Sequence, residues 1–161
     1  MRKNERFEVN IEGYTSEGAG VAKPDGYVLF IPNTVKGERV LAHVTKAGKN
    51  FGYARAMEII TPSPERVKPV CEVFSACGGC ELLHMSYKEQ LLFKKQKVAD
   101  AMRKSGIETS VDDTVPSPAI DGYRNKAQYP IRKKDGIAVG GFYRRGSHTV
   151  IESTCVIQPD I

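Results

Sequence analysis

The chain has 161 residues, of which 40% are hydrophobic and 27% charged, and its formal net charge is +5. This composition is typical of a soluble globular protein and excludes a disordered or fibrous class. The sequence has no run of about 18 or more apolar residues, and its first residues lead into an alternating pattern, not into the apolar core of a signal peptide. We therefore expect a cytoplasmic protein without a membrane segment.

The first 60 or so residues predict a small β-barrel. Residues 6–12 alternate between apolar and polar, which places Phe7, Val9 and Ile11 on one face of a half-buried strand. Asp25-Gly26 is a hairpin turn signal. Further strands are expected at residues 18–21, 27–31, 39–44 and 53–60. Five short strands at this spacing are typical of a small closed, OB-like barrel, a size that nucleic-acid-binding folds use.

A proline-rich stretch follows the barrel. Pro62, Pro64 and Pro69 lie close together, and neither a helix nor a central strand tolerates that density. We place a domain boundary here, with one domain at residues 1–61 and a second, incomplete at its C-terminus, at residues 62–161.

The second domain is expected to contain one long helix. Ser86 to Glu89 has the pattern of a capping box, and apolar side chains recur at helical spacing from Tyr87 to Met102 until Ser105-Gly106 provides a stop. Strands should follow at residues 123–134, 137–144 and 148–155, the first two joined by a turn at Asp135-Gly136. The fold class is thus α+β, mainly β with one long helix.

Four cysteines have the arrangement of ligands to a metal centre. Cys71, Cys77 and Cys80 lie within ten residues, and Cys155 follows 75 residues after the last of them. A centre built from them would join two separate segments and could not form in the unfolded chain. From spacing alone an iron–sulfur cluster is favoured, and a zinc site or a disulfide pair stays as an alternative.

Two adjacent glycines support a bulky centre, because Gly78 and Gly79 lack side chains and let the backbone wrap closely around it. The histidines are weaker candidates. His84 follows the clustered cysteines but is more often a packed side chain than a ligand in such a position. His43 and His148 have no acidic or cysteine companion at a motif spacing.

Seven basic residues lie between positions 124 and 145, against one acidic residue, Asp135. The seven are Arg124, Lys126, Arg132, Lys133, Lys134, Arg144 and Arg145. Aromatic side chains interleave with them. Because cations neutralise phosphates and aromatic rings stack on bases, this segment predicts contact with unpaired RNA. The alternative is a solvated sheet face with tyrosines in the core.

These motifs together resemble the RNA (uracil-5-)-methyltransferase family over essentially the whole chain. Residues 63–87, with the C-G-G-C motif, look like the family's iron–sulfur region and are the most specific part. Residues 123–126 and 141–155 resemble its central domain. The N-terminal barrel at residues 1–61, with the motifs at residues 17–22 and 25–26, resembles its TRAM domain, a small RNA-binding barrel. The resemblance implies a [4Fe–4S] cluster on Cys71, Cys77, Cys80 and Cys155.

The resemblance implies that members of this family add a C-terminal domain, which binds S-adenosylmethionine and carries the catalytic cysteine and base, and we expect this chain not to include it. Carbon 5 of uracil reacts only after a thiolate adds at carbon 6, so the reaction needs a spare cysteine. All four cysteines are assigned to the cluster, and no strand–G-x-G-x-x-G–helix unit is present. We therefore expect no catalytic residue, no S-adenosylmethionine contact and no activity in this chain alone.

The resemblance implies the RNA-recognition and cluster-binding part of a bacterial RNA uracil-C5 methyltransferase that uses S-adenosylmethionine. The expected substrate is 23S rRNA, with transfer RNA as the alternative, and the expected state is a monomer. Two other classes stay open. One is a stand-alone iron–sulfur redox protein, and the other is a zinc-stapled RNA-binding adaptor.

Overall fold

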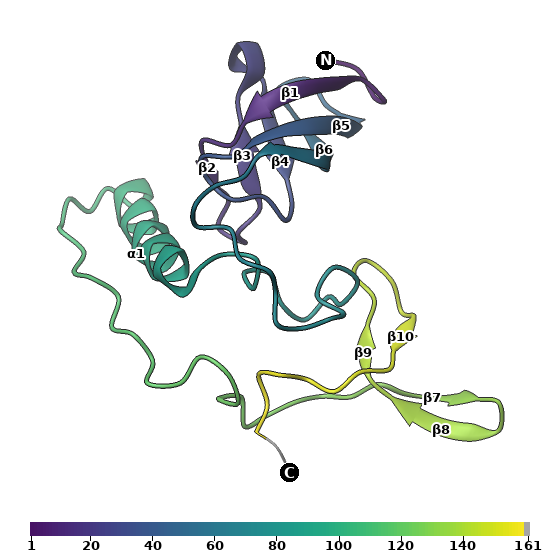
Figure 1. Ribbon diagram of the computed structural model, residues 1–161. Helices are drawn as coiled ribbons and strands as arrows, with labels where there is room; N and C mark the ends of the chain where they lie inside the picture. The colour runs from purple at the N-terminus through teal and green to yellow at the C-terminus, as the bar shows by residue number, and fades with distance from the viewer. Residues whose placement is uncertain (160–161) are drawn as a thin grey trace. The chain divides into compact units, whose positions relative to one another are not determined.

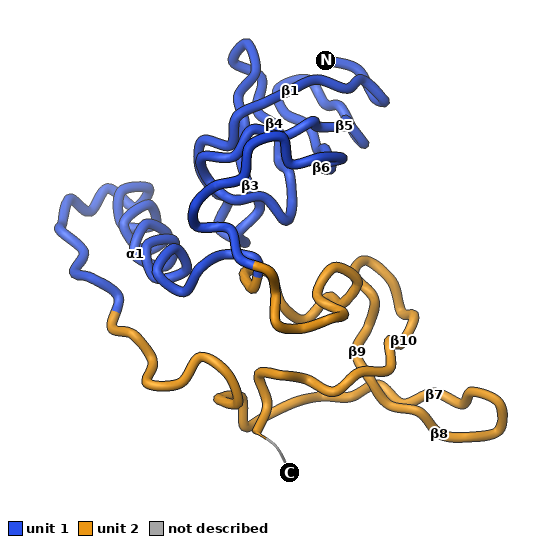
Figure 2. The backbone as a smooth tube through the Cα atoms, in the orientation of Figure 1, with its two compact units in different colours: residues 1–67, 84–114 blue, residues 68–83, 115–161 orange. Residues whose placement is uncertain are grey.

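The computed structural model describes residues 1–159 and divides the chain into two compact units (Figure 2). Unit 1 contains residues 1–67 and 84–114. Unit 2 contains residues 68–83 and 115–161, of which 160 and 161 lie outside the described residues. Each unit is thus made from two separate stretches of the chain. The units differ from the division expected after residue 61, because the long helix belongs with the barrel.

Unit 1 is built around a six-stranded sheet. Its strands are β1 (Arg6–Asn10), β2 (Gly13–Tyr14), β3 (Gly20–Ala22), β4 (Val28–Ile31), β5 (Arg39–Ala47) and β6 (Phe51–Thr61) (Figure 1). The order across the sheet is β1-β5-β6-β4-β3-β2, so the two outermost strands are consecutive in the chain. Between them, the amide of Ile11 donates to Glu38 beside β5, and the next amide donates to Val21 of β3, both at 2.8 Å. The sheet therefore closes into a barrel.

The five expected strands are present, and the first of them ends earlier than expected, at Asn10. The alternation in residues 6–12 is confirmed by burial, since Val9 and Ile11 are 6% and 2% exposed. The chain bends after Asn10, where its hydrogen-bond partners change from β5 to β3. Strand β2, which pairs with β3, is the one strand of this sheet that was not expected. The predicted hairpin turn between β3 and β4 is a short 3₁₀ turn at Pro24–Gly26.

The barrel core is made of small and medium apolar side chains on alternate strand positions. Burying a valine, leucine or isoleucine contributes roughly 1.5–3 kcal/mol, so this cluster is the main source of stability in unit 1. Its buried members are Val9, Ile11, Ala22, Leu29, Ile31, Val40, Ala42, Val44 and Ala54.

Helix α1 (Tyr87–Lys104) lies within one residue of its predicted bounds. Ser86 caps it, because its hydroxyl accepts a hydrogen bond from the amide of Glu89 at 3.1 Å. The capping box is only half formed. The carboxylate of Glu89 accepts a hydrogen bond from the hydroxyl of Tyr14 at 2.7 Å, and the Tyr14 ring packs edge-on against Phe93 at 5.6 Å. These two contacts dock the helix on the barrel.

The packed face of α1 is not the predicted one. Glu89 and Phe93 are its buried residues, whereas Val98 and Met102, expected on the apolar stripe, are 44% and 36% exposed. Among residues 1–159, no helix is long and apolar enough to cross a membrane.

Unit 2 contains two short antiparallel pairs of strands. They are β7 (Ile131–Lys134) with β8 (Ile137–Gly140), and β9 (Phe142–Tyr143) with β10 (Val150–Ile151). The turn between β7 and β8 is as predicted, with positive φ at Asp135 (51°) and Gly136 (85°). The predicted strands are longer than the observed ones. Pro130 has no amide hydrogen to extend a ladder before β7, and residues 137–144 pair partly with β7 and partly with β10.

The apolar core of unit 2 is small. Among residues 68–83 and 115–159, the buried apolar side chains are Phe74, Cys77, Val150 and Ile157. A core of this size contributes little toward offsetting the entropy of ordering the chain, and small units of this kind are usually held by disulfides or metals.

Candidate metal centre and nucleic-acid interface

The three clustered cysteines lie on a loop that is folded by backbone hydrogen bonds. The amide of Cys77 donates to the carbonyl of Val73 at 2.8 Å, which closes a single helical turn after Cys71. The amide of Gly79 donates to the sulfur of Cys77 at 3.4 Å. The loop therefore presents its sulfurs in a partly prepared arrangement.

Cys155 reaches the same region through the segment that follows β10. The amides of Gly122 and Arg124 donate to the carbonyls of Val156 and Ile157 at 3.2 and 2.8 Å. This short pairing brings the residue at position 124, the first of the seven basic candidates, beside the fourth cysteine.

All four cysteines line one cavity of about 30 Å³. Its walls are mostly apolar or small, and the side chain of Arg124 is also in its lining. Cys77 is buried, and the other three cysteines are half-buried and free of disulfides. Within residues 1–159, no group of three or more His, Cys, Asp or Glu side chains is arranged to hold a metal ion. The cysteines are thus gathered around one space without being in ligand geometry for an ion.

The thiols affect one another electrostatically. Burial raises the pKa of the Cys80 thiol, and nearby Cys155 and Cys77 raise it further, whereas Arg124 lowers it. A positive centre among the thiols would offset these effects, because metals bind the thiolate and release its proton. Four thiols around one space are a donor set suited to zinc or to an iron–sulfur cluster. In donor type and number, the four thiols match such a group.

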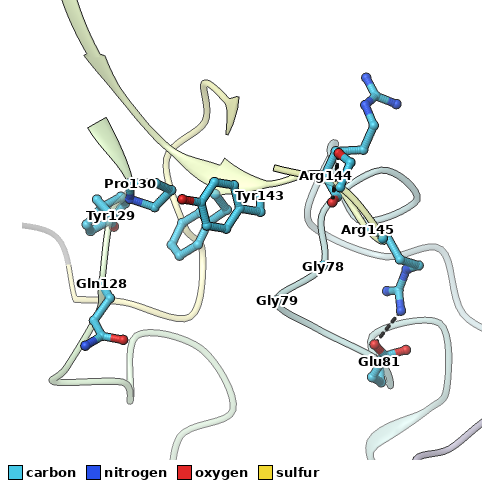
Figure 3. Close-up of a pocket in the computed structure, with 12 residues that line it drawn as sticks. Gly78, Gly79, Glu81, Gln128, Tyr129, Pro130, Tyr143, Arg144 and Arg145 are labelled. Carbon is cyan, nitrogen blue, oxygen red and sulfur yellow. Dashed lines mark hydrogen bonds and ion pairs between the residues drawn. The ribbon is translucent and has the colours of Figure 1, made fainter. Parts of the chain in front are cut away.

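Arg145 holds the cysteine loop. Its Nη2 donates to the carbonyl oxygens of Cys80 and Cys77 at 2.9 and 3.3 Å, and Nη1 forms an ion pair with Glu81 (Figure 3). Its backbone amide donates to the carbonyl of Ala76 at 2.8 Å. The guanidinium of this predicted RNA contact is therefore bound within unit 2.

The other basic candidates differ in how their charges are used. Glu152 forms ion pairs with Lys134 at 2.8 Å and with Arg132 at 3.7 Å, and the hydrogen bond from Lys134 lowers the pKa of that carboxyl. No ion pair involves the remaining four within residues 1–159. These four are Arg124, Lys126, Lys133 and Arg144.

Within the described residues, no histidine is in the lining of the thiol cavity. His84 is 1% exposed and belongs to unit 1, with its Nε2 at 3.3 Å from the carbonyl oxygen of Thr34. His43 is on β5, with its Nε2 at 3.4 Å from Asn4. His148 packs edge-on against the Tyr143 ring at 5.4 Å. His84 is therefore a packed side chain, as expected.

The barrel carries an aromatic cluster that the sequence reasoning missed. Phe30, Phe51 and Tyr53 lie with neighbouring ring centroids 5.6 to 6.0 Å apart. Phe51 and Tyr53 are 46% and 43% exposed. The alternation in β6 could have revealed them, because alternate residues from Phe51 to Arg55 are exposed and those between are buried. Arg55 is exposed on the same alternate positions of β6 as Phe51 and Tyr53. Exposed aromatic rings together with this cation form a surface suited to stacking of unpaired bases.

Comparison with known proteins finds a domain and relatives that are associated with RNA. Residues 2–57 match the TRAM domain. Relatives from Listeria innocua and Halalkalibacterium halodurans, both named as uncharacterized RNA methyltransferases, are each 45% identical over 98% of this chain and 35% of their own length. A similarly named relative from Clostridium tetani is 40% identical over 99% of this chain and 35% of its length.

The fold is also similar to that of a solved structure. The tRNA (uracil-54, C5)-methyltransferase of Pyrococcus abyssi, in complex with S-adenosyl-L-homocysteine, matches 95% of this chain and 33% of its own with 28% identity and a TM-score of 0.63. The chain thus spans about a third of the length of the relatives it matches. Its TRAM domain and these matches along 95% or more of its length support its assignment to the RNA (uracil-5-)-methyltransferase family.

Proposed function

We propose that this chain is the RNA-recognition and [4Fe–4S]-binding part of a monomeric RNA uracil-C5 methyltransferase that uses S-adenosylmethionine and modifies 23S rRNA. The similar protein from Pyrococcus abyssi is named as a methyltransferase of transfer RNA, so transfer RNA is the alternative substrate. Either RNA would place the protein in the cytoplasm.

The observation that carries this proposal is the cavity shared by Cys71, Cys77, Cys80 and Cys155. It lies beside the small apolar core of unit 2, so a bound group would contribute stability where packing contributes little. Bound there, a [4Fe–4S] cluster would supply covalent bonds from iron to sulfur that join the loop at residues 71–80 to the segment around Cys155. Its proposed role is structural.

RNA binding is supported in both units. The barrel has its exposed aromatic cluster next to Arg55, and unit 2 has four basic side chains without an ion pair among residues 1–159. Aromatic rings give sequence-tolerant stacking, while lysine and arginine give salt-dependent phosphate contacts. We assign no catalytic residue and no S-adenosylmethionine contact to this chain, because its four cysteines all line the cavity and a thiolate bound to a cluster would not act as nucleophile.

Metal analysis tests the cluster. Protein purified without oxygen should contain about four irons and four sulfides per chain and absorb broadly in the visible range, and Cys155→Ser should lose most of both. One zinc per chain with no iron would replace the proposal by the zinc-stapled adaptor. A reversible one-electron couple without RNA affinity would replace it by a redox protein.

A separate binding experiment tests the RNA partner. A 23S rRNA fragment and an unmodified transfer RNA should be titrated at the same salt concentration, because affinities at different salt cannot be compared. Tighter binding of the 23S fragment supports the proposed substrate. Tighter binding of the transfer RNA would exchange it for the alternative.

A further inference from the structure

Unit 2 has a second, larger cavity beside the cysteine loop. It is an open groove of about 840 Å³, a volume that would hold a ligand of small-molecule size. Tyr129, Pro130 and Tyr143 lie on one side of it, and Gly78 and Gly79 lie on the other (Figure 3). Neither the spacing of the basic residues nor the cysteine pattern pointed to this groove.

Its aromatic rings are exposed and held in place. Tyr143 and Tyr129 are 45% and 43% exposed. The Tyr143 ring packs edge-on against His148 at 5.4 Å, and the Tyr129 ring packs against Phe142 at 4.8 Å while its hydroxyl donates to Gln158. Because these rings are already positioned, a flat ligand would lose little free energy to ordering them.

Because Gly78 and Gly79 have no side chains, the backbone of the opposite wall approaches the strand that carries Tyr143. The amide of Gly78 donates to the carbonyl of Tyr143 at 3.0 Å, and a Cβ at Gly78 would lie 3.3 Å from that same oxygen. A side chain there would press against the strand that carries Tyr143. The backbone of the cysteine loop therefore forms a wall of the groove without filling it.

The two arginines in the lining have different environments. Arg145 is directed at Glu81, and this ion pair neutralises both side chains (Figure 3). Arg144 has no ion pair within residues 1–159, and its guanidinium extends away from that pair (Figure 3). One unneutralised cation thus stands at the edge of an aromatic groove, with its one lining carboxylate already paired.

We propose that this groove binds one unpaired nucleotide of the RNA. The base stacks on the Tyr143 ring, the Arg144 guanidinium contacts the adjacent phosphate, and Gln128 and Ser147 offer polar groups to the base edge. This inference rests on the proposed RNA-binding function and names a subsite for it. It also gives the cysteine loop a second role, since its glycines shape the wall of the subsite.

The test measures fluorescence anisotropy of a labelled 12-nucleotide oligouridine and of a blunt RNA duplex of the same length, with the protein of residues 1–161. Tyr143→Ala should weaken oligouridine binding about tenfold, which is the typical effect of losing one base stack, while Tyr143→Phe keeps the ring and should bind within about twofold of wild type. Arg144→Ala should weaken binding and reduce the slope of log K against log salt by about 0.7. Tyr123→Ala is the matched control, because Tyr123 is 56% exposed in the same unit and does not line the groove.

The outcomes separate this inference from the proposed function. If the folded wild-type chain binds neither RNA, the RNA-binding function itself fails. If the wild type binds but Tyr143→Ala and Arg144→Ala behave like Tyr123→Ala, only the groove is overturned. Equal losses in Tyr143→Ala and Tyr143→Phe would overturn stacking.

A measurement without any substitution guards against variants that fail to fold. Ultraviolet cross-linking of 5-iodouridine RNA to the wild-type protein, followed by peptide mapping, should label the peptide that contains Tyr143. Labelling confined to residues 1–61 would overturn the groove and leave RNA binding to the barrel.

Discussion

The guanidinium of Arg145 donates to the backbone carbonyl of Cys80 at 2.9 Å. The same nitrogen lies 3.3 Å from the carbonyl of Cys77, and the other nitrogen pairs with Glu81. One planar side chain thus bridges the backbone carbonyls of two candidate ligands. A loop prepared in this way loses less entropy when it binds its ligand.

Replacing Arg145 by lysine should loosen the cysteine loop. A lysine could still pair with Glu81, but a single ammonium lacks the planar fork that reaches two carbonyls at once. The lost hydrogen bonds should cost about 1.5–3 kcal/mol of local stability. Hydrogen exchange of peptides covering residues 71–83 should become faster, and a chelator should remove bound metal sooner.

Arg144→Lys is the matched control for this change, because Arg144 is adjacent in sequence and makes no ion pair within residues 1–159. It should leave exchange in the cysteine loop and metal release as in the wild type. Identical behaviour of the two variants would show that Arg145 does not hold the loop.

Two neighbouring glycines allow a second prediction. A Cβ added at Gly141 would lie 1.9 Å from the carbonyl oxygen of Ile151, so the backbone of β9 or β10 must move. At Gly140 the nearest atom would be the Cβ of Tyr129 at an ordinary 4.0 Å. Gly141→Ala should therefore destabilise unit 2 by at least the roughly 1–3 kcal/mol typical of overpacking.

Thermal unfolding with metal analysis of both alanine variants checks this. Gly140→Ala should retain wild-type stability and metal content, whereas Gly141→Ala should lose both, since β10 leads directly to Cys155. Equal stability of the two variants would mean that the strands accommodate the extra carbon without cost.

Sequence patterns predicted the elements whose signals are local. The Ser86 cap located the start of the helix within one residue, and both Asp-Gly turns have the positive φ angles that such pairs adopt. The weakly paired strands of unit 2 were predicted too long, because each strand's length depends on a partner that single-strand alternation does not specify.

The candidate site residues also differ in whether the sequence could predict their roles. Spacing grouped the four cysteines, and they do line one cavity. The roles of charged side chains were not predictable, since Arg145 and Glu89 resemble surface residues in sequence but bond to groups that are distant along the chain. Only a fold brings such partners together, so a run of basic residues could not show which of its members remain available to RNA.

Glu38 in the barrel provides a third prediction. Its carboxylate is fully buried, accepts a hydrogen bond from the amide of Val35 at 2.8 Å and forms an ion pair with Arg66. Removing one partner of a buried pair leaves an uncompensated charge, so Arg66→Ala should destabilise unit 1 by about 3–5 kcal/mol. Urea unfolding followed by circular dichroism measures this.

A surface pair on the same barrel is the control. Arg39 and Glu8 are 3.7 Å apart and about half exposed, so Arg39→Ala should cost less than about 1 kcal/mol. In a Glu38→Gln background the buried charge is gone, and Arg66→Ala should cost clearly less than alone. An undiminished cost in that background would contradict the assigned ion pair.

The contact between Tyr14 and Glu89 predicts a dependence on alkaline pH. Burial, followed by the hydrogen bond to the Glu89 carboxylate, raises the pKa of the Tyr14 hydroxyl above its ordinary value of about 10. The folded state therefore keeps a proton that the unfolded chain releases first. The stability contributed by this group is fully present below about pH 10 and is lost as the pH rises further.

Tyr14→Phe removes the hydroxyl and with it hydrogen bonds to Glu89 at 2.7 Å and from the amide of Lys36 at 2.9 Å. It should lower the free energy of unfolding by about 1–3 kcal/mol at pH 8, since Glu89 is left buried without this donor. The difference from wild type should then shrink between pH 10 and 11.5, because only the wild type loses the contribution of Tyr14 there.

Urea unfolding of both proteins across this range measures the difference directly, and all groups common to both cancel in it. Tyr27→Phe is the control, since the Tyr27 hydroxyl bonds to Gly48 at an exposed site away from Glu89. Comparing the two variants separates loss of the Glu89 contact from loss of a tyrosine hydroxyl that bonds to backbone. A constant difference for Tyr14→Phe from pH 8 to 11.5 would mean that the hydroxyl titrates alike in both states, and the helix would then depend on the Phe93 ring contact for its place on the barrel.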